Sequence, residues 1–93
     1  MTLRIYADFN SVYGANHEIC WCLRYGVTLG QVGKPLDEVA EELQLRTGML
    51  VTLFYVDESE EFEVSAVLEE DDSSPANRWR ARADWNTFRR IRG

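Results

Sequence analysis

The chain has 93 residues, of which 45% are hydrophobic and 12% aromatic, and it carries a net charge of −6 at pH 7. This composition excludes a disordered chain, and the length leaves room for one domain, which we place over residues 1–93. The longest apolar run, residues 49–56, is far shorter than the ~20 residues of a membrane-spanning helix, so we expect a soluble protein without membrane contact.

The first part of the chain predicts two strands. Hydrophobic residues alternate with polar ones over residues 3–9, and a similar alternation over residues 18–25 places Trp21 on the inner face. Cys20 and Cys22 lie two residues apart in the second strand, where a disulfide between them would be strained. We therefore expect two free thiols, which fit the reducing environment of the cytoplasm.

A short helix is predicted next, around residues 36–45. Apolar side chains recur there at intervals of three and four residues, which defines one helical face. The residues on this face are Leu36, Val39, Ala40 and Leu43. Pro35 suits the first turn and Gly48 the end, and the helix should cover an open side of the sheet.

The clearest pattern is a three-stranded meander in the second half of the chain. Residues 49–56 are almost all apolar and rich in β-branched and aromatic types, as in a central strand covered on both faces. An acidic turn at residues 57–60 leads to an alternating strand over residues 61–69. A hairpin loop over residues 70–77 then leads to a second alternating strand over residues 78–85.

The segment 45–85 resembles the meander of SH3-like small β-barrel domains, with a glycine before an apolar strand, an acidic turn and a tryptophan-containing last strand. Five strands in so short a chain also favour a small barrel over a sandwich of about seven strands. We predict a mainly β fold, a five-stranded antiparallel SH3-like barrel with one short helix. The resemblance implies a binding role, because such barrels serve peptide binding, RNA binding and chromatin reading alike.

No catalytic arrangement can be assembled from the sequence, so we expect no enzyme activity and no cofactor. The single histidine leaves few options for a general base, and the glycines are spaced too widely for a dinucleotide-binding loop. His17, Cys20 and Cys22 are the only soft metal ligands, whereas a structural zinc site needs four ligands. A metal shared between two copies of the chain stays open as an alternative.

Charge is distributed unevenly along the chain. Residues 1–74 contain fifteen acidic and four basic residues, whereas residues 75–93 contain one acidic residue and six arginines. Three of these arginines lie on the outer face of the last predicted strand. We expect them to form cross-strand ion pairs with Glu61, Glu63 and Glu69 of the preceding strand.

The acidic turn of the meander provides the leading functional hypothesis. Its carboxylates would attract the basic surface of another protein and speed the encounter. The candidate protein-binding residues are Asp57, Glu58, Glu60 and Glu61. We accordingly predict a small acidic protein-interaction module of the cytoplasm, without catalytic activity, whose partner is a protein with a basic surface.

The C-terminal segment supports an alternative hypothesis. Its arginines have no evident partner in the chain and neighbour aromatic side chains, a combination that suits phosphate contacts and base stacking. The candidate nucleic-acid-binding residues are Trp85, Phe88, Arg89, Arg90 and Arg92. Trp85, at the end of its strand, is expected to be partly exposed. The chain would then be an RNA-binding or ribosome-associated accessory protein, and a homodimer is compatible with either hypothesis.

Overall fold

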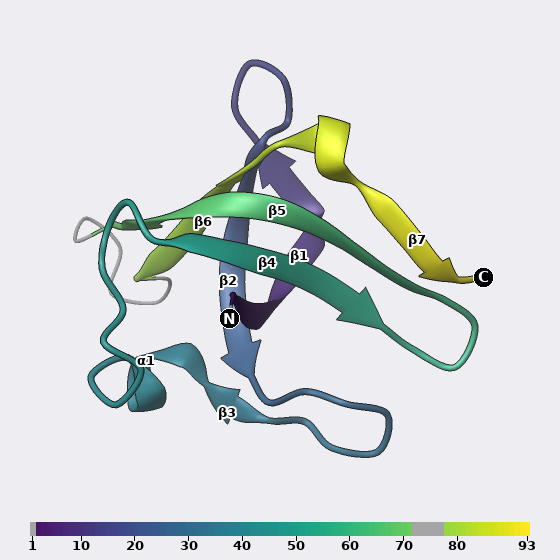
Figure 1. Cartoon of the computed structure of the whole chain (residues 1–93), viewed down its shortest axis with the longest axis horizontal. Helices are drawn as coiled ribbons and strands as arrows, with labels where there is room; N and C mark the ends of the chain where they lie inside the picture. Colours follow the sequence, from purple (N-terminus) through teal and green to yellow (C-terminus); the bar gives the residue numbers. More distant parts are fainter. Residues whose placement is uncertain (1, 72–77) are drawn as a thin grey trace.

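The computed structural model describes residues 2–71 and 78–93, so most of the loop predicted at residues 70–77 lies outside the described residues. The described part of the chain forms seven strands, one α-helix and one 3-10 helix (Figure 1). In chain order these are β1 (Leu3–Tyr13), β2 (Ile19–Tyr25), β3 (Lys34–Pro35), α1 (Leu36–Val39), β4 (Leu50–Val56), β5 (Glu61–Glu70), β6 (Trp79–Ala83), η1 (Trp85–Thr87) and β7 (Arg89–Arg92). None of the described helices has the length and apolar character needed to cross a bilayer.

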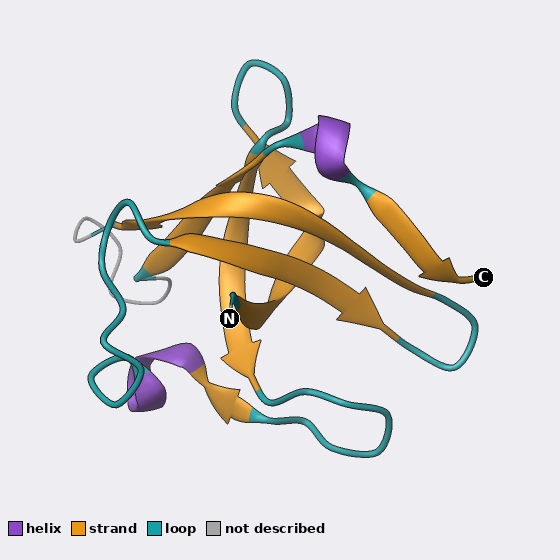
Figure 2. Cartoon of the chain, viewed as in Figure 1, coloured by secondary structure: helices purple, strands orange, loops and turns teal. Residues whose placement is uncertain are grey.

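Five of the strands close into a barrel, around which the remaining elements are arranged (Figure 2). The barrel order is β1-β4-β5-β6-β2, and β2 pairs back with β1 to close the ring. Closure leaves no free edge within the ring, which is how barrels avoid exposing unpaired backbone groups. The prediction of a mainly β chain with a small five-stranded barrel and one short helix is confirmed.

One pair of barrel strands is parallel, so the prediction of an antiparallel barrel is wrong. β1 and β4 run in the same direction with Ile5 beside Leu53, whereas the other four barrel pairs are antiparallel. The chain goes from β1 to β4 by way of β2, which runs antiparallel to β1 and ends beside Ile5 at the end of the barrel where β1 begins, and then through the segment that contains β3 and α1. Parallel neighbours need a long crossover of this kind.

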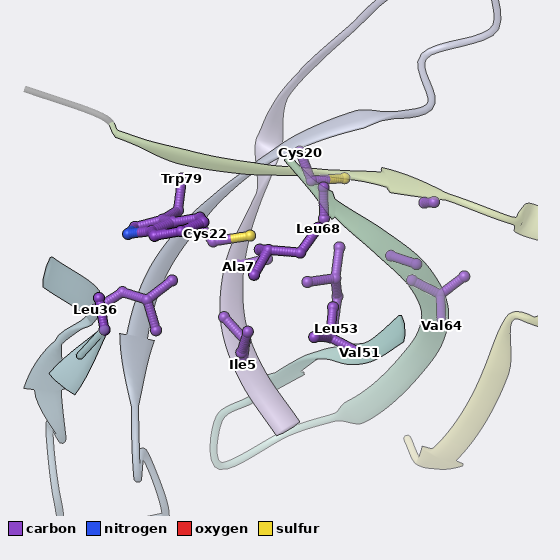
Figure 3. Packing of buried hydrophobic residues seen from close by; sticks show 14 of the residues in the cluster. Ile5, Ala7, Cys20, Cys22, Leu36, Val51, Leu53, Val64, Leu68 and Trp79 are labelled. Carbon is purple, nitrogen blue, oxygen red and sulfur yellow. The ribbon is translucent and has the colours of Figure 1, made fainter. Parts of the chain in front are cut away.

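Inward-facing side chains from all five strands fill the barrel (Figure 3). Ile5, Val64 and Leu68 are fully buried, in agreement with the alternation of their segments, and so are Val51 and Leu53 of the apolar segment 49–56. Removing each such side chain from water contributes roughly 1.5–3 kcal/mol relative to leaving it exposed. The core is therefore the main source of stability.

The inner face of β2 is the opposite of the one predicted. Cys20 and Cys22 point into the barrel and are buried (Figure 3). Trp21 lies outside the core, with its ring centroid 5.5 Å from that of Tyr13. Both faces of this strand are apolar in the sequence, so alternation alone did not decide which one faces inward. Small thiols suit the close-packed interior of a small barrel, where a tryptophan from every strand would not fit.

The helix is shorter than predicted, since α1 covers only Leu36–Val39 of residues 36–45. The chain then turns back through a Schellman motif, in which the Leu45 amide donates to the Ala40 carbonyl and Gln44 adopts a φ of 56°. This reversal ends the helix early because the chain must return to the barrel to begin β4 a few residues later.

The C-terminal segment contains a strand, β7, that the sequence pattern did not predict. β7 pairs with the first residues of β5, with Arg89 opposite Glu63 and Arg92 opposite Glu61, while β6 pairs with the other half of β5. Four residues with three arginines show no two-residue alternation. The strand forms because β5 extends past β6 and leaves a free edge beside it.

Candidate functional site

Four aromatic side chains gather where η1 crosses the ends of β1 and β5. The ring centroid of Phe62 lies 4.9 Å from that of Phe9 and 5.3 Å from that of Phe88, and Trp85 lies 6.3 Å from Phe9 and 6.4 Å from Phe88. We call these four residues the aromatic patch. Trp85 is 37% exposed and Phe88 is 41% exposed, so part of the patch faces solvent and the expectation for Trp85 is confirmed.

The exposed rings of the patch are held by the short helix η1. The indole nitrogen of Trp85 donates a hydrogen bond of 3.0 Å to the carbonyl of His17 in the β1–β2 turn. The hydroxyl of Thr87 accepts from the amide of Ser65 in β5 and donates to the carbonyl of Asp84. These hydrogen bonds fix the ring of Trp85 and the backbone of η1, and the ring of Phe88 then packs beside Trp85 and Phe62.

The arginines of β7, by contrast, have partners inside the chain, so the premise that they lack them is wrong. Arg89 forms an ion pair with Glu63, and Arg90 forms one with Glu60 at 3.4 Å. Arg92 donates to the backbone carbonyls of Asp57 and of Glu58, the latter at 2.8 Å. Much of the positive charge of the C-terminus is thus directed at the β4–β5 turn.

The acidic turn is itself a structured unit, built around the carboxylate of Asp57. This carboxylate accepts hydrogen bonds from the Tyr55 hydroxyl at 2.7 Å, from the Ser59 amide at 2.7 Å and from the Glu60 amide at 2.8 Å. These bonds, that of Tyr55 foremost, lower the pKa of Asp57 well below its usual range. The same bond raises the pKa of Tyr55 to about 12. Asp57 is therefore engaged in holding the turn.

The other candidate protein-binding residues are divided among internal contacts. Glu60 pairs with Arg90, and Glu61 pairs with Arg4 at 3.5 Å. Glu58 contributes its carbonyl to Arg92. The structure thus brings the two sequence-predicted sites together, with the acidic turn on one side and β7 on the other.

The ladder of ion pairs expected between β5 and β6 forms in part. Glu69 lies 3.5 Å from Arg80 and 3.2 Å from Arg82, as predicted. Glu61 and Glu63 pair elsewhere, with Arg4 and Arg89, because β7 and not β6 lies beside that part of β5. Sequence spacing gave the correct outer face but not the correct neighbour.

The three soft metal ligands of the sequence are not assembled into a site. Cys20 and Cys22 lie inside the barrel, and burial raises the pKa of Cys20 to about 11. His17 lies in the β1–β2 turn with a φ of 54° and is not part of the core. Over residues 2–71 and 78–93, no three His, Cys, Asp or Glu side chains gather as a metal would require.

A second apolar surface lies at the start of β1 and the loop that follows β2. A cleft of about 390 Å³ is lined by residues that include Leu3, Val27 and Phe54, with the guanidinium of Arg4 placed 4.2 Å from the centroid of the Phe54 ring. Leu29 is exposed at the tip of the adjoining loop. This surface carries the exposed aliphatic side chain of Leu29 on a loop, whereas the aromatic patch carries the exposed ring of Trp85, which is held by a hydrogen bond.

Sequence reasoning found two members of the aromatic patch and missed the other two. Phe9 and Phe62 were assigned to inward faces, and both are partly buried. Their positions in the sequence could have indicated this, because each lies at one end of a series of inward-facing residues. Side chains at the ends of a barrel are the ones that reach solvent.

Comparison of the chain with protein-family models, curated proteins and solved structures finds no match.

Proposed function

We propose that the chain is a small, non-catalytic protein-interaction module that docks partners on the aromatic patch. The observation that carries the proposal is a pair of neighbouring exposed aromatic rings, Trp85 and Phe88, of which Trp85 is held by a hydrogen bond to the His17 carbonyl. Aromatic side chains dominate the energetics of protein interfaces, and rings that are already ordered lose little conformational entropy on binding.

The surroundings of the patch support a polar rim. Arg89 and Arg90 lie beside it in β7, and Glu60 and Glu63 lie opposite them. An apolar centre surrounded by charged groups is the usual anatomy of a protein interface. The small five-stranded barrel also supports the proposed likeness to SH3-like domains, although its parallel β1–β4 pair departs from the antiparallel pattern that the resemblance implied.

The partner is proposed to be a cytoplasmic protein with a basic surface. The net charge of −6 supports this choice, because an acidic chain attracts positive surfaces and repels polyanions. The free thiols of Cys20 and Cys22 agree with a reducing compartment.

Nucleic-acid binding is the second candidate, and one observation favours it. Exposed rings next to arginines can stack on unpaired bases. The ion pairs of Arg89 and Arg90 with carboxylates weaken this candidate, since each would have to break before a phosphate could bind.

The test is affinity capture with matched surface variants of the full chain. Wild type, Phe88→Ser and Leu29→Ser would be used as bait with and without nuclease, and retained proteins identified by mass spectrometry. We expect a protein partner that resists nuclease, is kept by Leu29→Ser and binds Phe88→Ser at least about 10-fold more weakly. Equal capture by both variants would overturn the proposal, and loss of all partners on nuclease treatment would favour nucleic acid.

A further inference from the structure

β7 is attached to the barrel as an appendage and is not part of its wall. It pairs only with β5 among the described strands, over three register positions and across an irregularity between Glu61 and Phe62. All four of its residues are exposed. Figure 1 shows the strand beside one end of β5, leading to the C-terminus.

The boundary between the fixed and the detachable part of the C-terminus lies at Phe88. Before it, η1 is tied to two other segments: the Thr87 hydroxyl accepts a hydrogen bond from the Ser65 amide, and the Trp85 indole donates one to the His17 carbonyl. After it, β7 is held by edge pairing and by arginine contacts on the surface. Exposed ion pairs contribute little to stability and are weakened by salt, so β7 can detach while η1 stays in place.

The edge that β7 occupies is complementary to a basic, extended segment. Glu63 and Glu60 pair with successive arginines of β7, and the carbonyls of Asp57 and Glu58 receive Arg92. Phe62, at the same edge, is a member of the aromatic patch, with its ring centroid 5.3 Å from that of Phe88. The chain itself thus demonstrates which kind of segment this edge accepts.

We propose that β7 is an internal occupant of a docking edge on β5, and that an extended arginine-rich segment of a partner protein binds this edge by replacing it. Addition of a strand to a free sheet edge is a common mode of peptide recognition, in which backbone pairing gives affinity and side-chain contacts give specificity. The inference rests on the proposed protein-interaction function and names the chemistry of the partner. Because β7 is tethered to the barrel, its effective concentration at the β5 edge is about the millimolar level. β7 therefore excludes segments that bind this edge weakly or lack basic residues.

The test uses the full chain and a labelled peptide with the sequence Phe-Arg-Arg-Ile-Arg-Gly, which copies residues 88–93. The double variant Arg89→Glu/Arg90→Glu directs like charges at Glu63 and Glu60 and so releases the internal strand. Fluorescence anisotropy should show that the double variant binds the peptide about 10-fold more tightly than wild type does. Because β7 lies outside the core, circular dichroism should confirm that the barrel of the variant is intact.

Two further variants locate the site and control for net charge. Adding Glu63→Arg to the double variant should abolish peptide binding. The new positive charge repels the basic peptide, and it attracts the glutamates introduced into β7, so the internal strand occupies the edge again. The control Lys34→Glu/Arg46→Glu makes the same change in net charge at exposed residues away from β7, and should bind the peptide about as wild type does. A control that gains affinity equally would overturn the proposal by attributing the effect to net charge.

Other outcomes also decide the matter. Equal peptide affinity of wild type and the Arg89→Glu/Arg90→Glu variant would overturn the replacement of β7. The proposal would also be overturned if two copies of the chain exchanged their β7 strands and neither bound the peptide. Phe88-dependent capture of a partner without peptide binding would leave the interaction module standing and remove only this inference. Peptide binding without any Phe88-dependent partner would support the docking edge on β5 and would remove the aromatic patch as a docking site.

Discussion

Asp57 illustrates how the role of a residue changes when its contacts are known. In the sequence it belongs to a group of carboxylates suited to attract a basic partner. In the structure its carboxylate accepts bonds from Tyr55, Ser59 and Glu60 within one turn. An acidic residue bound in this way stabilises the turn, in which Glu60 pairs with Arg90 of β7.

Replacing Asp57 with Asn should lower the melting temperature at neutral pH. The folded protein holds the pKa of Asp57 below its usual range, mainly through the Tyr55 hydroxyl and then the turn amides. The resulting stability is present above the unfolded-state pKa of about 3.9 and is lost as the pH falls through the lower folded-state value. Thermal unfolding should therefore show a gap between wild type and Asp57→Asn that narrows below about pH 4.

Glu58→Gln is the matched control for this experiment, because the Glu58 carboxylate makes no hydrogen bond or ion pair with the described residues. Its melting temperature should follow that of wild type at every pH. A gap for Asp57→Asn that keeps the same size from neutral to strongly acidic pH would show that the charge of Asp57 does not stabilise the turn.

The strands divide into those whose pairing is local and those whose pairing is not. β4, β5 and β6 follow one another in the chain and pair as a meander, so alternation and turn residues predicted them correctly. The parallel pairing of β1 with β4 and the docking of β7 on β5 join segments distant in sequence. Periodicity shows which face of a strand is buried, but it carries no information on which strand lies beside it.

β7 should be the least protected strand in native-state hydrogen exchange. It has one neighbour, exposed side chains and surface ion pairs, so it opens without disturbing the core. We expect its amides to exchange at least ~10-fold faster than those of β4, measured by NMR on the full chain. Raising the salt concentration to about 1 M should speed exchange in β7 and leave β4 unchanged.

The opposite finding would be equally informative. If the amides of β7 were protected as well as those of β4 and did not respond to salt, β7 would be an integral part of the fold. The replacement of β7 by a partner would then require partial unfolding of the barrel.

The charge of the whole molecule is arranged around this appendage. The chain is acidic, yet its basic residues are concentrated near the C-terminus, and β7 folds back so that its arginines meet the acidic turn. Both charged segments are evident in the sequence, but they were predicted as two separate sites. Residues 57–61 and 89–92 are far apart in the chain, so the sequence alone does not indicate that they are in contact. The aromatic patch lies beside this contact, so the patch, the acidic turn and β7 form one continuous surface.

Much of the barrel could be predicted because its core residues occupy one face of each strand, as Val64 and Leu68 do in β5. The inner face of β2 could not, since Trp21 and the two cysteines are all apolar and only the width of the barrel interior selects between them. The sequence analysis identified several residues of the candidate site. Their arrangement could not be predicted, because it depends on the pairing of strands that are distant in the sequence.

The central claim is that the edge of β5 is a docking site and β7 its internal occupant. Backbone amide spectra of the full wild-type chain, recorded while the peptide copying residues 88–93 is added to saturation, test it most directly. We expect the amides of β7 to move to positions typical of a disordered chain, while those of residues 61–63 shift and remain in a strand. Shifts centred on the acidic residues 69–71 or on the loop after β2, with β7 unchanged, would contradict it.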